Sequence, residues 1–135
     1  MSIPLPELIS RSKKFELLYV EDNEDARRYT LEMLTRFFEH ITVAENGLEG
    51  LEKFKQKKFD LILSDINMPR MSGIEMISKI RELDQSILII MLSAHNEPNY
   101  YEEVSGYDVK YYLSKPLALA KLVETLNLIF KDDTA

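Results

Sequence analysis

The chain has 135 residues, 45% of them hydrophobic and 30% charged, which suits one folded domain and argues against a disordered chain. Its net charge of −6 disfavours direct binding to nucleic acid, because phosphate binding needs a basic surface. There is no cysteine for disulfides or thiolate metal sites, and no apolar stretch of the roughly 20 residues that span a membrane. We therefore expect a cytoplasmic protein that contacts neither nucleic acid nor membrane.

The first 14 residues are predicted to be a lead-in to the domain. Pro4 and Pro6 should interrupt any helix in this segment, because proline lacks a backbone N–H and clashes with the preceding turn. Leu5, Leu8 and Ile9 could still pack as a short helical turn.

From residue 15 the chain alternates between short apolar runs and amphipathic segments. Apolar residues at helical spacing identify the amphipathic segments, and capping pairs such as Ser72 and Glu75 mark where helices begin. In chain order we expect strand 15–20 then helix 23–38, strand 41–44 then helix 46–56, strand 60–65 then helix 72–83, strand 87–92 then helix 96–105, and strand 109–113 then helix 117–130.

Strands that alternate with helices of this length favour a parallel sheet covered on both faces, a doubly wound three-layer α/β sandwich. The runs at 15–20, 60–65 and 87–92 are almost wholly apolar, which is typical of central strands buried on both sides. The run at 41–44 is short and is expected at an edge. In such folds ligands bind beyond the carboxyl ends of the strands, where the strand order reverses.

Chemically active side chains follow four of the predicted strands. They are Glu21, Asp22, Asp65, Ser93 and Lys115. Three carboxylates in one cleft repel each other and raise one another's pKa, so we expect a cation among them. Oxygen ligands without cysteine favour a hard ion such as Mg²⁺. Carboxylates, a hydroxyl, an ammonium and Mg²⁺ together are suited to holding a phosphoryl group.

From about residue 15 to residue 130 the sequence resembles the receiver domain of two-component response regulators. Four blocks carry the resemblance, in the family's order: YVEDN at 19–23, SDINMPRMSG at 64–73, MLSAH at 91–95 and YYLSKP at 111–116. The resemblance implies a flavodoxin-like (βα)5 fold with strand order 2-1-3-4-5. It also implies a receiver domain at 15–131, followed by a C-terminal tail at 132–135.

The same resemblance implies the roles of the acidic residues. Asp65 is expected to accept the phosphoryl group, and its ionised carboxylate should need no base to activate it. Asp22 and Asp65 are expected to bind Mg²⁺ directly together with the backbone carbonyl of Asn67. Glu21 is expected to hold the same ion through water.

The remaining positions are implied to work as a switch. Ser93 is expected to donate its hydroxyl to the phosphoryl group, Lys115 to pair with its oxygens and with Asp65 at rest, and Tyr112 to turn inward afterwards. The bond from Lys115 to Pro116 is expected to be cis. At the rim, Asn67 tunes phosphoaspartate hydrolysis in relatives, and His95 either does the same or has no role.

One departure from the family pattern concerns the entry to the fifth strand. Asp108 stands where relatives usually have glycine, seven residues before Lys115. Aspartate tolerates left-handed backbone better than most residues, so the turn should still form.

We therefore predict a signalling module that takes a phosphoryl group from a histidine kinase or phosphotransfer domain onto Asp65. It would not be an enzyme beyond its own phosphorylation and dephosphorylation. Its output would pass to a downstream protein or a covalently linked domain. A homodimer could form through the helix at 96–105, the strand at 109–113 and the helix at 117–130.

Two other functions remain as alternatives. One is a receiver-like interaction module that takes no phosphate. The other is a phosphatase of the haloacid dehalogenase type, which is disfavoured because such enzymes place an acid where this chain has Asn67.

Overall fold

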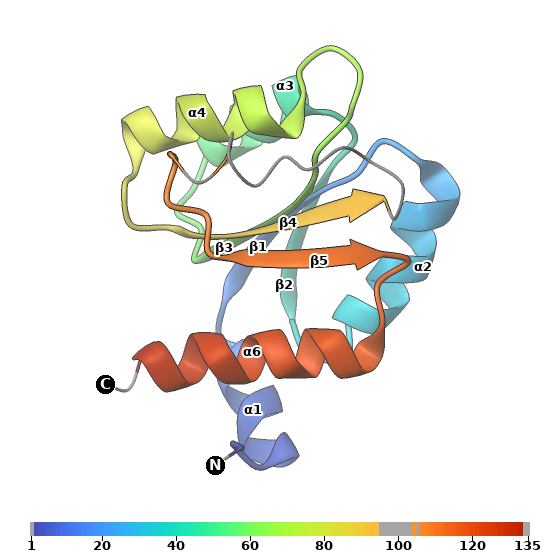
Figure 1. Cartoon of the computed structure of the whole chain (residues 1–135), viewed down its shortest axis with the longest axis vertical. Helices are drawn as coiled ribbons and strands as arrows, with labels where there is room; N and C mark the ends of the chain where they lie inside the picture. Colours follow the sequence, from blue (N-terminus) through green and yellow to red (C-terminus); the bar gives the residue numbers. More distant parts are fainter. Residues whose placement is uncertain (1, 95–103, 105, 134–135) are drawn as a thin grey trace.

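The computed structural model describes residues 2–94, 104 and 106–133, and these form one sheet with helices on both of its faces (Figure 1). The sheet has five parallel strands in the order β2-β1-β3-β4-β5, so the predicted fold class and strand order are confirmed. The elements are α1 (Leu5–Ser12), β1 (Glu16–Val20), α2 (Glu24–Leu34), β2 (His40–Ala44), α3 (Gly47–Phe54), β3 (Leu61–Asp65), α4 (Gly73–Leu83), β4 (Leu88–Ala94), β5 (Tyr111–Lys115) and α6 (Leu119–Asp133). The helix predicted at 96–105 lies almost wholly outside the described residues.

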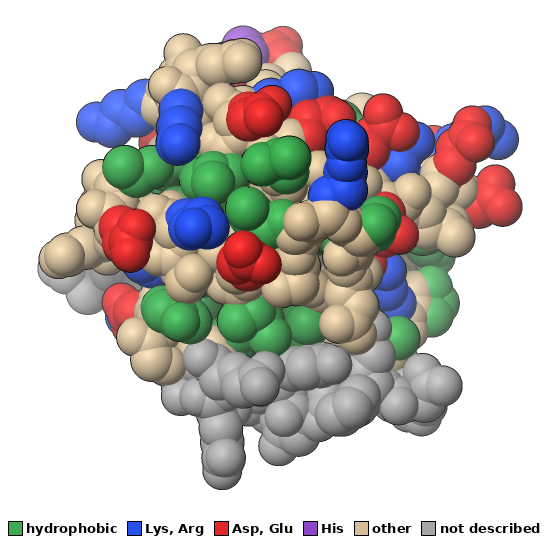
Figure 2. Space-filling view, turned by 90° about the horizontal axis from the view of Figure 1, so that it is seen from above, with side chains coloured by type: hydrophobic (Ala, Val, Ile, Leu, Met, Phe, Trp, Pro, Cys, Tyr) green, Lys and Arg blue, Asp and Glu red, His purple; other side chains and the backbone are tan. Residues whose placement is uncertain are grey.

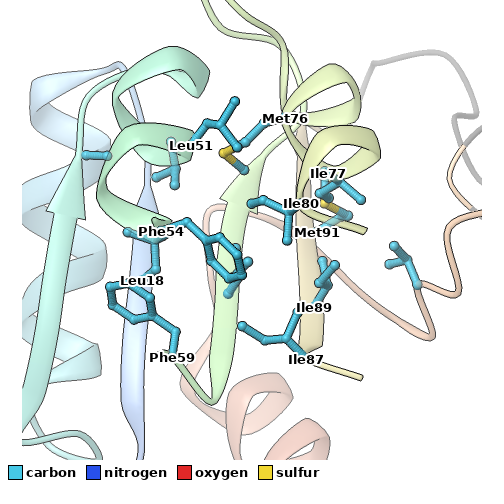
Figure 3. Close-up of a cluster of buried hydrophobic side chains, with 14 of the residues drawn as sticks. Leu18, Leu51, Phe54, Phe59, Met76, Ile77, Ile80, Ile87, Ile89 and Met91 are labelled. Atoms are coloured by element: carbon cyan, nitrogen blue, oxygen red, sulfur yellow. The ribbon is translucent and has the colours of Figure 1, made fainter. Parts of the chain in front are cut away.

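Two clusters of buried side chains fill the space on either side of the sheet. Helices α3 and α4 cover one face, where Phe54 and Ile80 lie over strand residues such as Leu18 and Ile89 (Figure 3). Helices α1, α2 and α6 contribute to the cluster on the other face. The strand β3 is buried at every position, including the polar residues Ser64 and Asp65 at its end, as expected for a central strand.

The outer face over α3 and α4 carries apolar side chains among charges of both signs (Figure 2). Within the described part of the chain, no helix is long and apolar enough to cross a membrane.

The first helix corrects the prediction that prolines interrupt the N-terminal segment. Pro4 is the N-cap of α1 and Pro6 lies in its first turn, where backbone N–H groups have no partner within the helix. Leu8 is fully buried against the core, and the hydroxyl of Ser12 donates to the carbonyl of Phe37, 2.5 Å away. The segment is therefore packed onto the domain.

The fifth strand begins two residues later than predicted, at Tyr111 instead of residue 109. In the turn before it, Asp108 adopts a left-handed conformation, with φ 58°, as expected for the position that relatives give to glycine. Arg81 at the end of α4 donates to the carbonyls of Tyr107 and Asp108, at 2.6 and 3.2 Å. Val109 is buried and so looked like a strand residue in the sequence, although parallel pairing starts only at Tyr111.

The second helix is shorter than predicted and ends at Leu34, not at residue 38. Phe37 and Phe38 continue the apolar pattern because both are buried in the core from the turn after the helix. The pattern of buried residues therefore continues past the end of α2 and does not show where the helix ends.

Candidate functional site

Three acidic side chains meet at the carboxyl edge of the sheet. Glu21 and Asp22 follow the last residue of β1, and Asp65 is the last residue of β3. The two strands pair in parallel, with Val20 opposite Ser64, so the acids leave the sheet at the same level. One carboxylate oxygen from each acid lies within 4.8 Å of the others. Glu21 and Asp65 are buried, whereas Asp22 is exposed.

Lys115 completes this group from the opposite side of β4. It is the last residue of β5, and its Nζ lies 2.8 Å from Glu21 Oε1 and 2.9 Å from Asp65 Oδ2. The peptide bond that follows it, to Pro116, is cis as expected. One ammonium thus bridges the two buried carboxylates.

The electrostatics of the site centre on Asp65. Burial raises the pKa of Asp65 from its ordinary 3.8 to about 7, and the hydrogen bond and charge of Lys115 only partly oppose this while Glu21 raises it further. Burial also lowers the pKa of Lys115, but its bonds to Glu21 and Asp65 outweigh burial and leave the pKa raised. The raised pKa of Asp65 means that a bound cation would favour its ionised form.

Ser93 and Tyr112 lie on the strands beside this group. Asp65 pairs with Leu92, so Ser93 is one residue further along β4, where it is half-buried. Tyr112 packs against the core under α4, and its hydroxyl donates to the carbonyl of Val109, 2.9 Å away. His95 lies outside the described residues.

The loop after β3 is held close to the site by glycine. A Cβ on Gly73 would lie 2.1 Å from the carbonyl oxygen of Asp65, and the Gly73 N–H donates to Ile66 O, 2.7 Å away. Arg70 in the same loop has φ 70°, which is uncommon for a residue with a side chain. Asn67 is exposed in this loop, two residues after Asp65.

Sequence reasoning missed Arg27, in the first turns of α2. Its guanidinium donates to the carbonyl of Glu21, 2.9 Å away, and pairs with Glu45, 3.4 Å away. An arginine shortly after an acid pair was the only signal in the sequence, and nothing in its spacing indicated a backbone partner.

A groove opens beside the site between α2 and the chain after β5. Its volume is about 490 Å³, and its walls include Ala26, Tyr29, Ala94, Lys115 and Pro116. The hydroxyl of Tyr29 reaches across to the carbonyl of Leu117, 3.3 Å away.

The fold and the acidic edge define a receiver-type signalling module. The family model for the response regulator receiver domain matches residues 17–127, and the chain belongs to that family. The acidic cluster of Glu21, Asp22 and Asp65 fits the phosphorylation site of such domains.

Individual relatives agree with this assignment. The chain is 33% identical over 116 residues to the chemotaxis protein CheY of Thermotoga maritima, covering 85% of this chain and 97% of that protein. It is 37% identical to the hybrid signal transduction histidine kinase D of Dictyostelium discoideum over 84% of this chain, but that spans only 7% of the kinase. A solved CheX–CheY–BeF3–Mg²⁺ complex from Borrelia burgdorferi has a TM-score of 0.77 at 28% identity, covering 86% of this chain and 89% of the matched chain.

The donor set at the edge also fits a divalent cation. It consists of oxygen atoms from three carboxylates, two of which are buried, and hard ions such as Mg²⁺ prefer oxygen ligands. A cation there would favour the ionised form of Asp65, whose pKa is raised first by burial and then by the charge of Glu21.

Proposed function

We propose that this chain is a phosphoacceptor receiver that takes a phosphoryl group onto Asp65. The observation that carries the proposal is the position of the Asp65 carboxylate, which is buried 2.9 Å from the Lys115 ammonium and grouped with Glu21 and Asp22. An acid that only marked the end of a strand would not explain why a second buried acid and a lysine lie beside it.

The cation site would be formed by Asp22, Asp65 and the carbonyl of Asn67, with Glu21 acting through water. Mg²⁺ bound there would neutralise charge on the transferred group and favour the ionised form of Asp65. The neighbouring CheY in the Borrelia complex is described with BeF3 and Mg²⁺, which supports this choice of ion.

In the transfer, an Asp65 carboxylate oxygen attacks phosphorus as the donor's phosphorus–nitrogen bond breaks, and the electron pair of that bond stays on the donor imidazole. Lys115 lies close enough to follow the phosphoryl oxygens, although it would then leave Asp65. Ser93, half-buried on the neighbouring strand, would donate its hydroxyl to the group. The product is an acyl phosphate, so the domain is changed by the reaction and does not turn over a substrate.

The switch would involve Tyr112. Its hydroxyl bond to the carbonyl of Val109 would have to break before the ring could turn. The added charge of about −1.5 to −2 at Asp65 would draw Ser93 toward it, and the surface around β5 and α6 would change. That surface, together with the segment 96–105, is the proposed site of a downstream contact or of a homodimer.

The donor is proposed to be a histidine kinase or a phosphotransfer domain. The groove beside Lys115, with Ala26 and Tyr29 on one wall and Pro116 on the other, gives a protein donor an apolar surface next to the acceptor. Family membership supports the same donor class.

The test is the intact mass of the chain after incubation with Mg²⁺ and a small acyl-phosphate donor. We expect one phosphoryl adduct that requires Mg²⁺ and is absent from Asp65→Asn. The matched control is Asp60→Asn, because Asp60 is an exposed acid just before the same strand and should leave the adduct unchanged.

Two results would redirect the proposal. No adduct with small donors or with histidine kinases would indicate an interaction module that works without phosphate. Steady hydrolysis of a phosphomonoester would indicate a phosphatase.

A further inference from the structure

We propose that Arg27 is a positioning residue that fixes the acid pair of Glu21 and Asp22 for the cation. This inference rests on the proposed function, since it concerns the same cation site. Arg27 lies in α2, its side chain is only 16% exposed, and its guanidinium contacts the backbone carbonyls of both acids and the carboxylate of Glu45.

The first step in the argument is the position of the acids between two elements. The N–H of Glu21 donates to Ala44 O at the end of the sheet, and α2 begins three residues later, with Asn23 as its N-cap. The carbonyls of Glu21 and Asp22 belong to neither element. Arg27 Nη1 donates to both, at 2.9 Å and at a longer 3.5 Å.

The second step is the contact of the same guanidinium with the neighbouring loop. Arg27 Nη2 lies 3.4 Å from Glu45 Oε1, and Glu45 is the first residue after β2. The helix that follows Glu45, α3, is joined to the loop after β3, because the N–H of Gly47 donates to Met71 O. Arg27 therefore links the loop after β1 to the loop after β2, and Gly47 links the loop after β2 to the loop after β3. The acids converge at this edge of the sheet.

The third step weighs position against charge. A guanidinium near three carboxylates could weaken cation binding by repulsion, in which case its removal would tighten binding. The pair with Glu45 offsets part of its charge, and the short bond to the Glu21 carbonyl fixes the backbone that carries both acids. Groups that orient metal ligands typically change metal affinity by 10- to 100-fold, so we expect the positioning effect to exceed the repulsion.

The experiment measures Mg²⁺ affinity of the folded domain by isothermal titration calorimetry. The variants are Arg27→Met, which removes charge and bonds, and Arg27→Lys, which keeps the charge but cannot bridge both loops. Arg28→Met is the matched control, since Arg28 is the adjacent residue, is 71% exposed and pairs only with Glu24 among the contacts described. We expect Arg27→Met to weaken Mg²⁺ binding about tenfold, Arg27→Lys to weaken it less, and Arg28→Met to leave it unchanged.

A second readout separates positioning from general loss of structure. The Mg²⁺ concentration that half-saturates adduct formation should rise in Arg27→Met while the limiting rate at saturating Mg²⁺ changes little. A merely structural role would lower the amount of reactive protein equally at every Mg²⁺ concentration, and would overturn the inference. If Arg27→Met does not fold, Arg27→Lys alone decides the question by the same two readouts.

The outcomes also distinguish this inference from the proposed function. Failure of the wild type to bind Mg²⁺ would refute the cation site itself. Wild-type binding with tighter or unchanged binding in Arg27→Met would refute only the role of Arg27.

Discussion

Lys115 Nζ lies 2.9 Å from Asp65 Oδ2, across the whole width of β4. The same ammonium is 2.8 Å from Glu21 Oε1, so two buried carboxylates share the one ammonium group of Lys115. Burial raises the pKa of Asp65, the second buried acid Glu21 raises it further, and Lys115 only partly opposes both effects.

The first prediction concerns pH and stability without metal. The pKa of Asp65 is about 7 in the folded protein and near 3.8 when unfolded, so the folded protein binds the extra proton between these values. Protonation of Asp65 therefore stabilises the folded wild type. This contribution is fully present below about pH 4 and is lost as the pH rises through 7. Asp65→Asn removes this pH dependence. The free energy of unfolding of the variant, relative to that of the wild type, should therefore increase from pH 4 to pH 7. The increase is at most a few kcal/mol, because one pKa unit corresponds to about 1.4 kcal/mol.

Urea unfolding at each pH unit from 4 to 8, with a chelator present, measures this difference. Asp60→Asn serves as the control and should show no comparable trend. A difference between Asp65→Asn and wild type that stays constant across this range would show that Asp65 titrates normally.

The second prediction concerns the glycine after β3. Gly73→Ala would place a Cβ 2.1 Å from the Asp65 carbonyl oxygen, a backbone atom that cannot move without shifting the acid. We expect a loss of about 1 to 3 kcal/mol in the free energy of unfolding and weaker Mg²⁺ binding by calorimetry. Gly106→Ala is the control, because a Cβ there meets no atom within 4 Å. Equal effects of the two substitutions would contradict the close approach at Gly73.

The third prediction concerns the turn before β5. Arg81 donates to the carbonyls of Tyr107, Asp108 and Asp84, so Arg81→Met leaves three acceptors without this donor. The expected cost is about 1 to 3 kcal/mol in denaturant unfolding, with faster amide exchange at the start of β5. Lys79→Met, on the exposed side of the same helix, should change neither quantity. Normal exchange in β5 of the Arg81 variant would show that the turn holds without it.

The fourth prediction tests whether α1 is part of the folded unit. Leu8 is fully buried, whereas Leu5 in the same helix is 50% exposed. Leu8→Ala should lower the free energy of unfolding by about 2 to 5 kcal/mol through lost burial and a cavity, and Leu5→Ala should lower it far less. A small effect of Leu8→Ala in thermal or urea unfolding would mean that α1 is a detachable lead-in.

The sequence identified most of the architecture because the physical signals were local. Apolar runs such as 60–65 predicted buried strands, and Ser72 predicted a helix start, which its hydroxyl now caps by accepting from the N–H of Glu75. The acids at the strand ends could be grouped from sequence as well, since parallel strands bring their carboxyl ends to one edge.

Boundaries were less predictable where burial continued beyond an element. Val109 and Phe37 are both buried, yet neither belongs to the adjacent strand or helix. Periodicity reports which side chains face the core, and it does not report which backbone groups pair.

By itself, the sequence determined the order of strands and helices along the chain, the fold class and the set of acids at one edge. The pair of Lys115 with Asp65 was expected from the family resemblance. Only the tertiary structure decided that Lys115 also contacts Glu21, that Arg27 holds the carbonyls of the acid pair, and that Arg81 holds the turn before β5. The physical reason is that these contacts join residues through the distance and direction of side chains on separate elements. Local spacing fixes the faces of each element, but packing fixes where those faces meet.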